Sequence, residues 1–256
     1  MSRKPFPYIA YMLRSRQGAL DLVQSKSEIV CIIPALNEKA TIGRVVSRAL
    51  EHCGAVLVVD DNSQDQTAEE SLKAGAKVIR HILRLGTGGA LSTGFRAALR
   101  GGFKTFVTID GDGQHDPDEI PTALDPILKR QADIVIGSRV LHGSGSMPLV
   151  KKIGNRILSI ATSFASGTKI TDSQSGFRAY RRQVLEYAIH RGWDYRWASE
   201  ILALTSKGNF KIKEVPITAV YFPKRQRGAS IKDGFKILYS TIRGTREKKS
   251  FTHGKP

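Results

Sequence analysis

Acidic and amide side chains follow an apolar run in the segment TFVTIDGDGQHDPDE, residues 105–119. Asp110, Asp112 and Gln114 alternate with other residues, and in an extended chain residues two apart point to the same side. Magnesium and manganese usually take one or two protein carboxylates and complete their shell with water and phosphate oxygens. Aspartate and glycine are also common turn formers, so the pattern alone leaves both interpretations open. The segment predicts a Mg²⁺ or Mn²⁺ site only if other parts of the chain support it.

Two further polar clusters end apolar runs and give that support. Asp60 and Asp61 end the run VLVVDD, and Asn37 and Glu38 follow the run IIPAL. The carboxyl ends of parallel strands meet at one edge of a sheet, and open α/β sheets bind their ligands beyond that edge. We therefore expect the three clusters to converge on one site.

The elements that must position these residues alternate along the first half of the chain. Continuous apolar runs predict strands buried on both faces, and helical spacing of apolar residues predicts the helices between them. Strands are expected at 28–35, 55–60, 76–81, 104–110 and 132–139, with helices within 37–54, 67–75, 88–100 and 118–130. Ser63 to Gln66 fits a capping box that opens the second helix. The alternation predicts an α/β fold, a Rossmann-like, mostly parallel sheet flanked by helices.

The second half of the chain is less regular. We expect a helix at 149–165, a loop at 166–180, a helix at 196–207, a strand at 211–222, and then a basic loop and a final helix. No repeat or linker marks a boundary inside this region. We therefore predict a basic N-terminal leader (1–27), a single domain (28–240) and a basic C-terminal tail (241–256).

Composition narrows the function classes. The 256 residues include 40 Lys and Arg against 23 Asp and Glu, a formal net charge of +17. Such a surface attracts polyanions: nucleic acid, nucleotide phosphates or an anionic bilayer. The two cysteines lack metal-site or disulfide spacing and predict reduced thiols. No apolar run approaches the ~20 residues of a spanning helix and no secretory signal is readable, which predicts a cytoplasmic chain.

Six segments together resemble a known family. In chain order they are IIPALNE, VVDDNSQDQT, GTGGALSTGF, DGDGQHDP, IGSR and DSQSGFRAY. They are similar to the family 2 glycosyltransferases of the GT-A fold, specifically the dolichyl- or polyprenyl-phosphate hexose synthases, over about residues 28–235. The resemblance implies an inverting, metal-dependent transfer of a hexose from a nucleotide-diphospho-sugar, GDP-mannose or UDP-glucose, to a polyprenyl or dolichyl phosphate. It also implies Mg²⁺ or Mn²⁺ as cofactor.

The resemblance assigns the donor-binding residues. Pro34, Leu36 and Glu38 would line the nucleoside pocket, with Asp61 near the base. Asp110 would lie beside the ribose and the metal. These roles are expectations carried over from the family's motifs.

The resemblance also assigns the metal and phosphate contacts. Asp112 and Gln114 would hold the metal on the diphosphate, and Arg139 and Arg225 resemble the family's arginines for acceptor phosphate and donor diphosphate. The resemblance leaves open which arginine serves which phosphate, and it adds Ser230 and Lys232 to Arg225 as substrate-binding residues. The chain departs from the family at two places: Thr87 stands in the glycine loop and Ile231 after Ser230, where the family often has lysine.

The acceptor decides whether a base is needed. A polyprenyl phosphate is already ionised, so Asp172 would act by positioning rather than by taking a proton. A family 2 enzyme that acts on a soluble hydroxyl acceptor would need Asp172 or Glu200 as general base. Asp172 could also be a turn residue, and Glu200 part of an ion pair.

Two basic amphipathic stretches bear on the membrane. Residues near 151–164 and 230–246 combine an apolar stripe with Lys and Arg. Such helices lie on anionic membrane surfaces, and they also pack on a domain's own sheet. The first alternative predicts peripheral attachment to the cytoplasmic membrane face and leaves room for a membrane-anchoring partner subunit.

A basic RNA-binding module is the alternative from another class. It accounts for the net charge, but it gives no reason for acids at three strand ends, and no aromatic RNA-binding motif is present. We therefore expect no nucleic acid partner.

Overall fold

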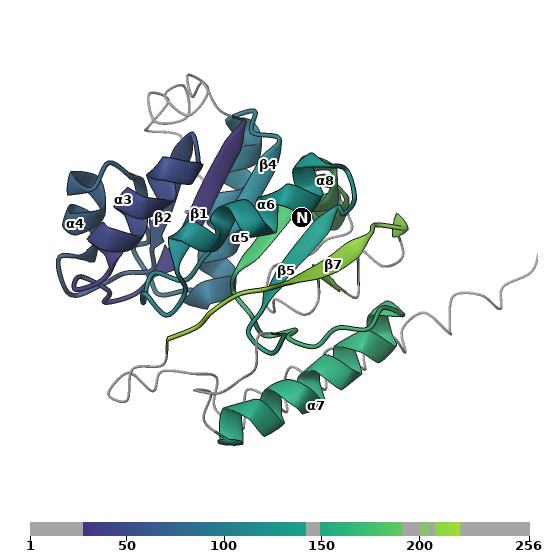
Figure 1. The fold of residues 1–256 in the computed structure, drawn as a ribbon. Coiled ribbons are helices and arrows are strands. Elements are labelled where there is room, and N and C mark those ends of the chain that lie inside the picture. The colour runs from purple at the N-terminus through teal and green to yellow at the C-terminus, as the bar shows by residue number, and fades with distance from the viewer. Residues whose placement is uncertain (1–27, 142–148, 191–200, 203, 205–207, 221–256) are drawn as a thin grey trace, which may run out of the picture.

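The computed structural model describes residues 28–141, 149–190, 201–202, 204 and 208–220 (Figure 1). Its strands are β1 (Ile29–Ala35), β2 (Ala55–Asp60), β3 (Lys77–Arg80), β4 (Thr105–Thr108), β5 (Ile134–Ser138), β6 (Arg178–Arg181) and β7 (Ile212–Pro216). Its helices are α3 (Ile42–His52), α4 (Thr67–Lys73), α5 (Gly86–Arg100), the 3₁₀ turn η1 (Pro117–Glu119), α6 (Ile120–Leu128), α7 (Leu149–Ser166) and α8 (Arg182–His190). None of these helices combines the length and hydropathy that crossing a bilayer requires.

The described strands form one mixed sheet in the order β3-β2-β1-β4-β6-β5-β7. All pairings are parallel except those of β6, which runs antiparallel to both β4 and β5. The sheet confirms the predicted mostly parallel α/β fold. The predicted helix at 196–207 and the final helix lie largely or wholly outside the described residues, as do the leader and the tail.

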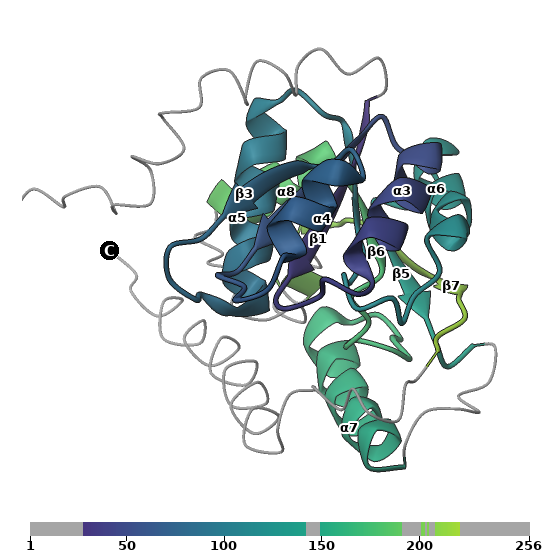
Figure 2. The same cartoon turned by 90° about the vertical axis from the view of Figure 1, so that its left-hand side faces the viewer.

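Both faces of the sheet are buried under helices. On β1, Val30 and Ile32 point to one face and Cys31 and Ile33 to the other, and all four are fully buried. The apolar stripes of α3 and α6 cover the face of Cys31, while α5 and α8 cover the face of Val30 (Figure 2). Two-sided burial explains why β1 reads as a continuous apolar run.

The prediction of a loop over 166–180 is wrong at the C-terminal end of that range. Residues 178–181 form β6, with Tyr180 paired to Phe106 of β4 and to Ile134 of β5. Helix α8 follows at once and was not predicted. A strand of four residues is too short to show an alternation of apolar and polar residues. The sequence RAYR, which begins with arginine, therefore favours a loop prediction.

The capping box predicted at Ser63 is also wrong. Helix α4 begins at Thr67, whose backbone amide donates a hydrogen bond to Oδ1 of Asp65 (3.0 Å). Ser63 instead accepts a hydrogen bond from the backbone amide of Asn37 (2.9 Å). Its hydroxyl therefore ties two strand ends together rather than opening a helix.

Gly94 sets how closely α5 approaches the sheet. A Cβ at this position would lie 2.4 Å from Cγ2 of Ile32, on the central strand β1. We predict that Gly94→Ala lowers the free energy of unfolding by about 1–3 kcal/mol, because the helix must move off β1. Urea denaturation measures the change.

Gly154→Ala is the matched control. Gly154 lies in α7 with nothing within 4 Å of its would-be Cβ, so the substitution should leave stability unchanged or raise it by about 0.5–1 kcal/mol through helix propensity. Equal effects of the two substitutions would contradict the close approach.

Candidate active site

The three predicted polar clusters meet at one edge of the sheet. The loop after β1 is tied to the loop after β2: Oδ1 of Asn37 accepts from the amide of Gln64 (2.8 Å), and Ser63 accepts from the amide of Asn37. Thr41 donates to the carbonyl of Gly111, beyond β4 (2.9 Å). These bonds cross between loops that follow different strands, so the expected convergence of the strand ends is confirmed.

Asp110 stands at the centre of this edge, two residues after β4. Its side chain keeps 40% exposure. Partial removal from bulk water, followed by the charge of Asp112, raises its pKa to about 6, and Glu38 adds to the rise, while Arg139 and Arg178 oppose it. Carboxylates from β1 and β4 ends thus crowd one another. A divalent cation would relieve the repulsion, so the donor set fits the predicted metal site.

The chain turns sharply after Asp110 instead of staying extended. Gly113 has a φ of +73°, and Oδ1 of Asp112 accepts from the amide of Gln114 (3.0 Å). The argument that alternation alone aligns Asp110, Asp112 and Gln114 is therefore wrong, because it assumed extended backbone. Asp112 still lies close enough to raise the pKa of Asp110, whereas the metal role of Gln114 stays a prediction.

Gly176 makes room for the Asp110 carboxylate. A Cβ on Gly176 would lie 2.5 Å from Oδ2 and 2.8 Å from Oδ1 of Asp110. The segment that carries Gly176 is held by Thr108, which donates to the Gly176 carbonyl (2.7 Å). No larger residue fits here without moving the carboxylate, a role that the sequence pattern did not reveal.

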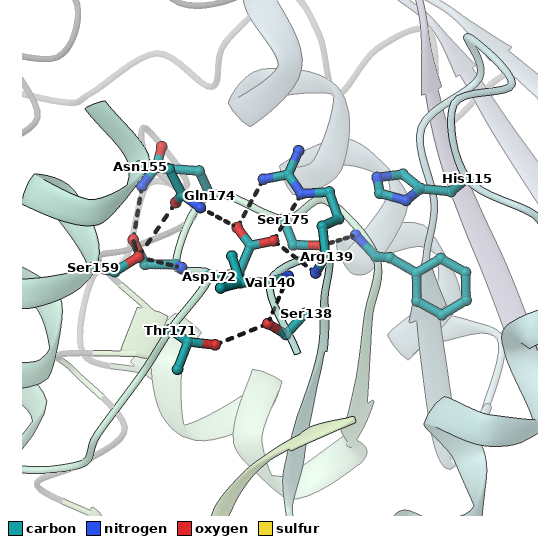
Figure 3. Close-up of polar contacts among 12 residues, drawn as sticks. His115, Ser138, Arg139, Val140, Asn155, Ser159, Thr171, Asp172, Gln174 and Ser175 are labelled. Atoms are coloured by element: carbon teal, nitrogen blue, oxygen red, sulfur yellow. Dashed lines mark hydrogen bonds and ion pairs between the residues drawn. The ribbon is translucent and has the colours of Figure 1, made fainter. Parts of the chain in front are cut away.

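Arg139 and Asp172 form a buried ion pair beside this edge (Figure 3). Asp172 is fully buried and accepts from Nε and Nη2 of Arg139 (both 2.7 Å), from its backbone amide (3.0 Å) and from Nδ2 of Asn155 (2.9 Å). Burial alone would raise the pKa of Asp172, but the hydrogen bonds and charge of Arg139 hold it below its ordinary value. A carboxylate with these partners positions Arg139 and is a poor proton acceptor.

Glu214 and Arg178 are structural partners that sequence reasoning missed. Glu214, on β7, accepts from the amides of Thr171 (2.9 Å) and Asp172 (3.0 Å) and so fixes the loop that carries Asp172. Arg178 is almost fully buried and donates to the carbonyls of Ser173 and Ser175. The run GFRAY contains this arginine, but its burial depends on the place of β6 between β4 and β5.

Asp61 is buried and anchors the glycine-rich start of α5. Its carboxylate accepts from Nδ1 of His81 (2.7 Å) and from the amides of Leu85 (2.8 Å) and Gly86 (2.7 Å). Burial would raise its pKa, but these hydrogen bonds and the His81 contact lower it overall. Its assignment near the base stays a prediction.

His115 lies next to Asp110 but carries no charge. Burial, and then the positive Arg139, lower its pKa to about 3, so the 3.9 Å between Nε2 and Oδ2 of Asp110 joins a neutral ring to a carboxylate. Its ring packs edge-on against Phe177 at 5.8 Å between centroids. Its buried Nδ1 finds no hydrogen-bond partner among the described residues.

The remaining assigned residues divide into two groups. Pro34 and Leu36 are half-buried at and just beyond the end of β1, beside the loop that carries Glu38. Arg225, Ser230, Lys232 and the alternative base Glu200 lie outside the described residues.

Comparison with known proteins identifies the family. The model of Glycosyl transferase family 2 matches residues 30–188, more than half of the chain. The chain belongs to this family. It is 36% identical to a UDP-N-acetylglucosamine--dolichyl-phosphate N-acetylglucosaminyltransferase of Methanococcus voltae over 84% of this chain and 94% of that protein. It is 32% identical to a polyprenol monophosphomannose synthase of Mycolicibacterium smegmatis over 87% of this chain and 90% of that protein.

A solved structure of the same fold holds a metal and a nucleotide. Glucosyl-3-phosphoglycerate synthase from Mycobacterium tuberculosis, in complex with Mg²⁺ and uridine diphosphate, matches with a TM-score of 0.65 and 22% identity over 94% of this chain and 85% of that one. The family 2 glycosyltransferase described here thus has the GT-A fold, and it is an enzyme rather than a non-enzymatic RNA-binding module.

Asp110 should destabilise the metal-free enzyme at neutral pH. Its pKa is higher folded than unfolded, so folding stability falls as pH rises from about 4 to 6 and stays reduced above. Asp110→Asn should raise the unfolding temperature at pH 7.5 by ~2–4 °C, after discounting for solvent exposure, with no gain below about pH 4. Scanning calorimetry in EDTA at both pH values measures this.

Asp125→Asn is the control for that measurement. Asp125 is an exposed carboxylate on α6 that pairs with Lys129 rather than with another acid. A gain for Asp110→Asn that is the same at pH 4 and pH 7.5 would contradict the crowding.

Asp172→Asn should leave Arg139 buried with a weakened partner. We predict a loss of about 3–5 kcal/mol in the free energy of unfolding, measured by urea denaturation. Activity should fall because Arg139 loses its position, while the pH profile of kcat keeps its shape, because Asp172 transfers no proton. A missing limb in that profile would identify Asp172 as a base instead.

Proposed function

We propose that this enzyme transfers a hexose from a nucleotide-diphospho-sugar to a polyprenyl or dolichyl phosphate, with inversion at the anomeric carbon and with Mg²⁺ or Mn²⁺. The relatives from Methanococcus voltae and Mycolicibacterium smegmatis, a dolichyl-phosphate N-acetylglucosaminyltransferase and a polyprenol monophosphomannose synthase, support a lipid phosphate acceptor. The donor base and hexose stay open, since these relatives name different sugars.

The observation that carries the proposal is the bonding of Asp172, which makes this carboxylate an unsuitable base. A general base works best with a pKa near the working pH. Asp172 has a lowered pKa and four donors on its carboxylate, and His115 has a pKa of about 3. An acceptor that arrives ionised, such as a phosphate, needs no base.

Asp110 has a pKa that would suit a general base, but we assign it to the metal instead. Its pKa of about 6 would suit proton transfer, yet Asp112 lies beside it, and a divalent cation held by the pair would lower that pKa again. Asp110, Asp112 and, as a prediction, Gln114 would hold the ion on the donor diphosphate. When bound, the ion would neutralise the charge that builds on the leaving diphosphate.

The protein's own groups complete the reaction. Arg139, fixed by Asp172, would draw the acceptor phosphate to the edge of the sheet near Asp110, and its charge already acts there by lowering the pKa of Asp110. A phosphate oxygen then attacks the anomeric carbon as the bond to the diphosphate oxygen breaks and its electron pair leaves with the diphosphate. Attack opposite the leaving group inverts the anomeric configuration. Arg225, Ser230 and Lys232 remain proposed donor contacts.

The acceptor also bears on where the enzyme works. A polyprenyl phosphate is held in a bilayer, so we propose peripheral attachment at the cytoplasmic face, on an anionic membrane surface. A membrane-anchoring partner subunit remains part of this proposal.

Paired acceptors test the function. Radiolabelled GDP-mannose, UDP-glucose and UDP-N-acetylglucosamine are each supplied with dolichyl phosphate or with dolichol. We expect transfer from one donor to the phosphate alone, abolished by EDTA and flat above about pH 7, where a phosphate monoester is fully ionised. NMR of the product gives the anomer. Equal transfer to dolichol, or activity that survives EDTA, would refute the proposal.

Asp112→Asn should lower kcat about 100-fold or more, as expected when leaving-group stabilisation is lost. Asp125→Asn, an exposed substitution on α6, is the matched control and should retain full activity. A variant Asp112→Asn with unchanged kcat would show that the metal is held elsewhere or not used.

A further inference from the structure

Helix α7 presents an apolar stripe to solvent. It stands apart from the two helical layers that cover the sheet (Figures 1 and 2). Leu149, Ile153, Ile157, Ile160 and Phe164 recur every three or four residues and therefore share one face of the helix. These side chains are between 52% and 91% exposed, with Phe164 the most exposed. An exposed apolar stripe of four turns marks an interaction surface.

The opposite face of α7 is polar and buried. Asn155, Ser159, Thr162 and Ser166 are at most 7% exposed. Asn155 donates a hydrogen bond to Asp172 (Figure 3). The hydroxyl of Ser159 donates to the hydroxyl of Ser173 and accepts from its backbone amide. A surface helix normally turns its apolar side to the protein and its polar side to water. This helix does the reverse, and its buried hydrogen bonds fix that orientation.

The charges of α7 select one kind of partner. The helix contains Lys151, Lys152 and Arg156 and no acidic residue, and Lys152 and Arg156 are exposed. A second copy docked through this face in a two-fold dimer would bring these like charges together. Anionic lipid headgroups complement them, and a stripe of Leu, Ile and Phe beside Lys and Arg suits burial at the boundary between headgroups and acyl chains.

We propose that α7 is the membrane-docking element of this enzyme and lies in the surface of a bilayer that contains anionic phospholipid, with its stripe buried and its cations among the headgroups. The reason for docking, access to a lipid phosphate acceptor, rests on the proposed function, whereas the docking itself does not. Asn155 on the buried face holds Asp172, which holds Arg139. The docking helix is thus linked through Asp172 to Arg139, which would receive a phosphate carried by a lipid.

Vesicle flotation with the full chain tests the proposal. The probe is vesicles of phosphatidylcholine with phosphatidylglycerol, compared with phosphatidylcholine alone. We expect the parent to float with the anionic vesicles. Ile153→Gln/Ile160→Gln should partition at least about tenfold more weakly, because it lacks two apolar side chains that would be buried in the bilayer. The matched control is Leu72→Gln/Leu128→Gln, two exposed leucines on α4 and at the end of α6, which should float like the parent. Equal flotation of all three proteins would overturn the proposal.

A depth measurement locates the stripe directly. Cys31 and Cys53 are buried, so a nitroxide on Ile160→Cys labels this helix selectively. We expect the bound label to become accessible to oxygen and protected from an aqueous nickel complex. A label that stays in water while the protein floats would overturn the proposal, since another surface would then hold the membrane.

Two readouts separate this proposal from the alternatives. If light scattering shows a dimer that Ile153→Gln/Ile160→Gln dissociates without weakening flotation, a second copy covers the stripe and the proposal fails. Thermal shift by donor and Mg²⁺ in vesicle-free buffer should be the same for variant and parent, which also shows that the variant is folded. A parent that floats through α7 but transfers no sugar to dolichyl phosphate would refute the proposed function and leave this one standing.

Discussion

The site depends on the buried carboxylate of Asp172. It accepts four hydrogen bonds, three from Arg139 after β5 and one from Asn155 on α7. A buried charge is tolerated only when its partners satisfy it, so this one carboxylate forces the end of β5, the 170–177 segment and α7 into a single arrangement. Glu214 fixes the same segment from β7 through backbone amides.

The consequences of that arrangement reach Asp110. The segment anchored at Asp172 continues to Gly176, which leaves just enough room for the Asp110 carboxylate, and then enters β6 beside β4. Arg178, held by the carbonyls of Ser173 and Ser175, adds positive charge near that carboxylate. Positive and negative groups are thus separated over a short distance: carboxylates follow β1 and β4, and Arg139 follows β5. In a chain with a net charge of +17, Glu38, Asp110 and Asp112 form a local acidic cluster where the ends of β1 and β4 meet.

The first half of the fold could be predicted from the sequence because its strands are buried on both faces and its helices have one apolar stripe. The convergence of Asn37, Asp60 and Asp110 on one edge followed from parallel pairing. The inward arginine on β6 could not be predicted, because a four-residue strand has no readable period and the antiparallel pairing depends on long-range contacts. Neither could the turn at Gly113 or the role of Gly176, since both depend on backbone geometry that a run of Asp and Gly does not specify.

Helix α7 shows a further limit of sequence patterns. Periodicity separates an apolar face from a polar one, but it does not say which face meets the protein. Here the decision rests on satisfaction of polar groups: Asp172 needs a donor from Asn155, and the loop at Ser173 needs Ser159, so the polar face must turn inward. The apolar face is then exposed as a direct consequence. A site built from a buried ion pair has, in this chain, also determined which helix face is left exposed.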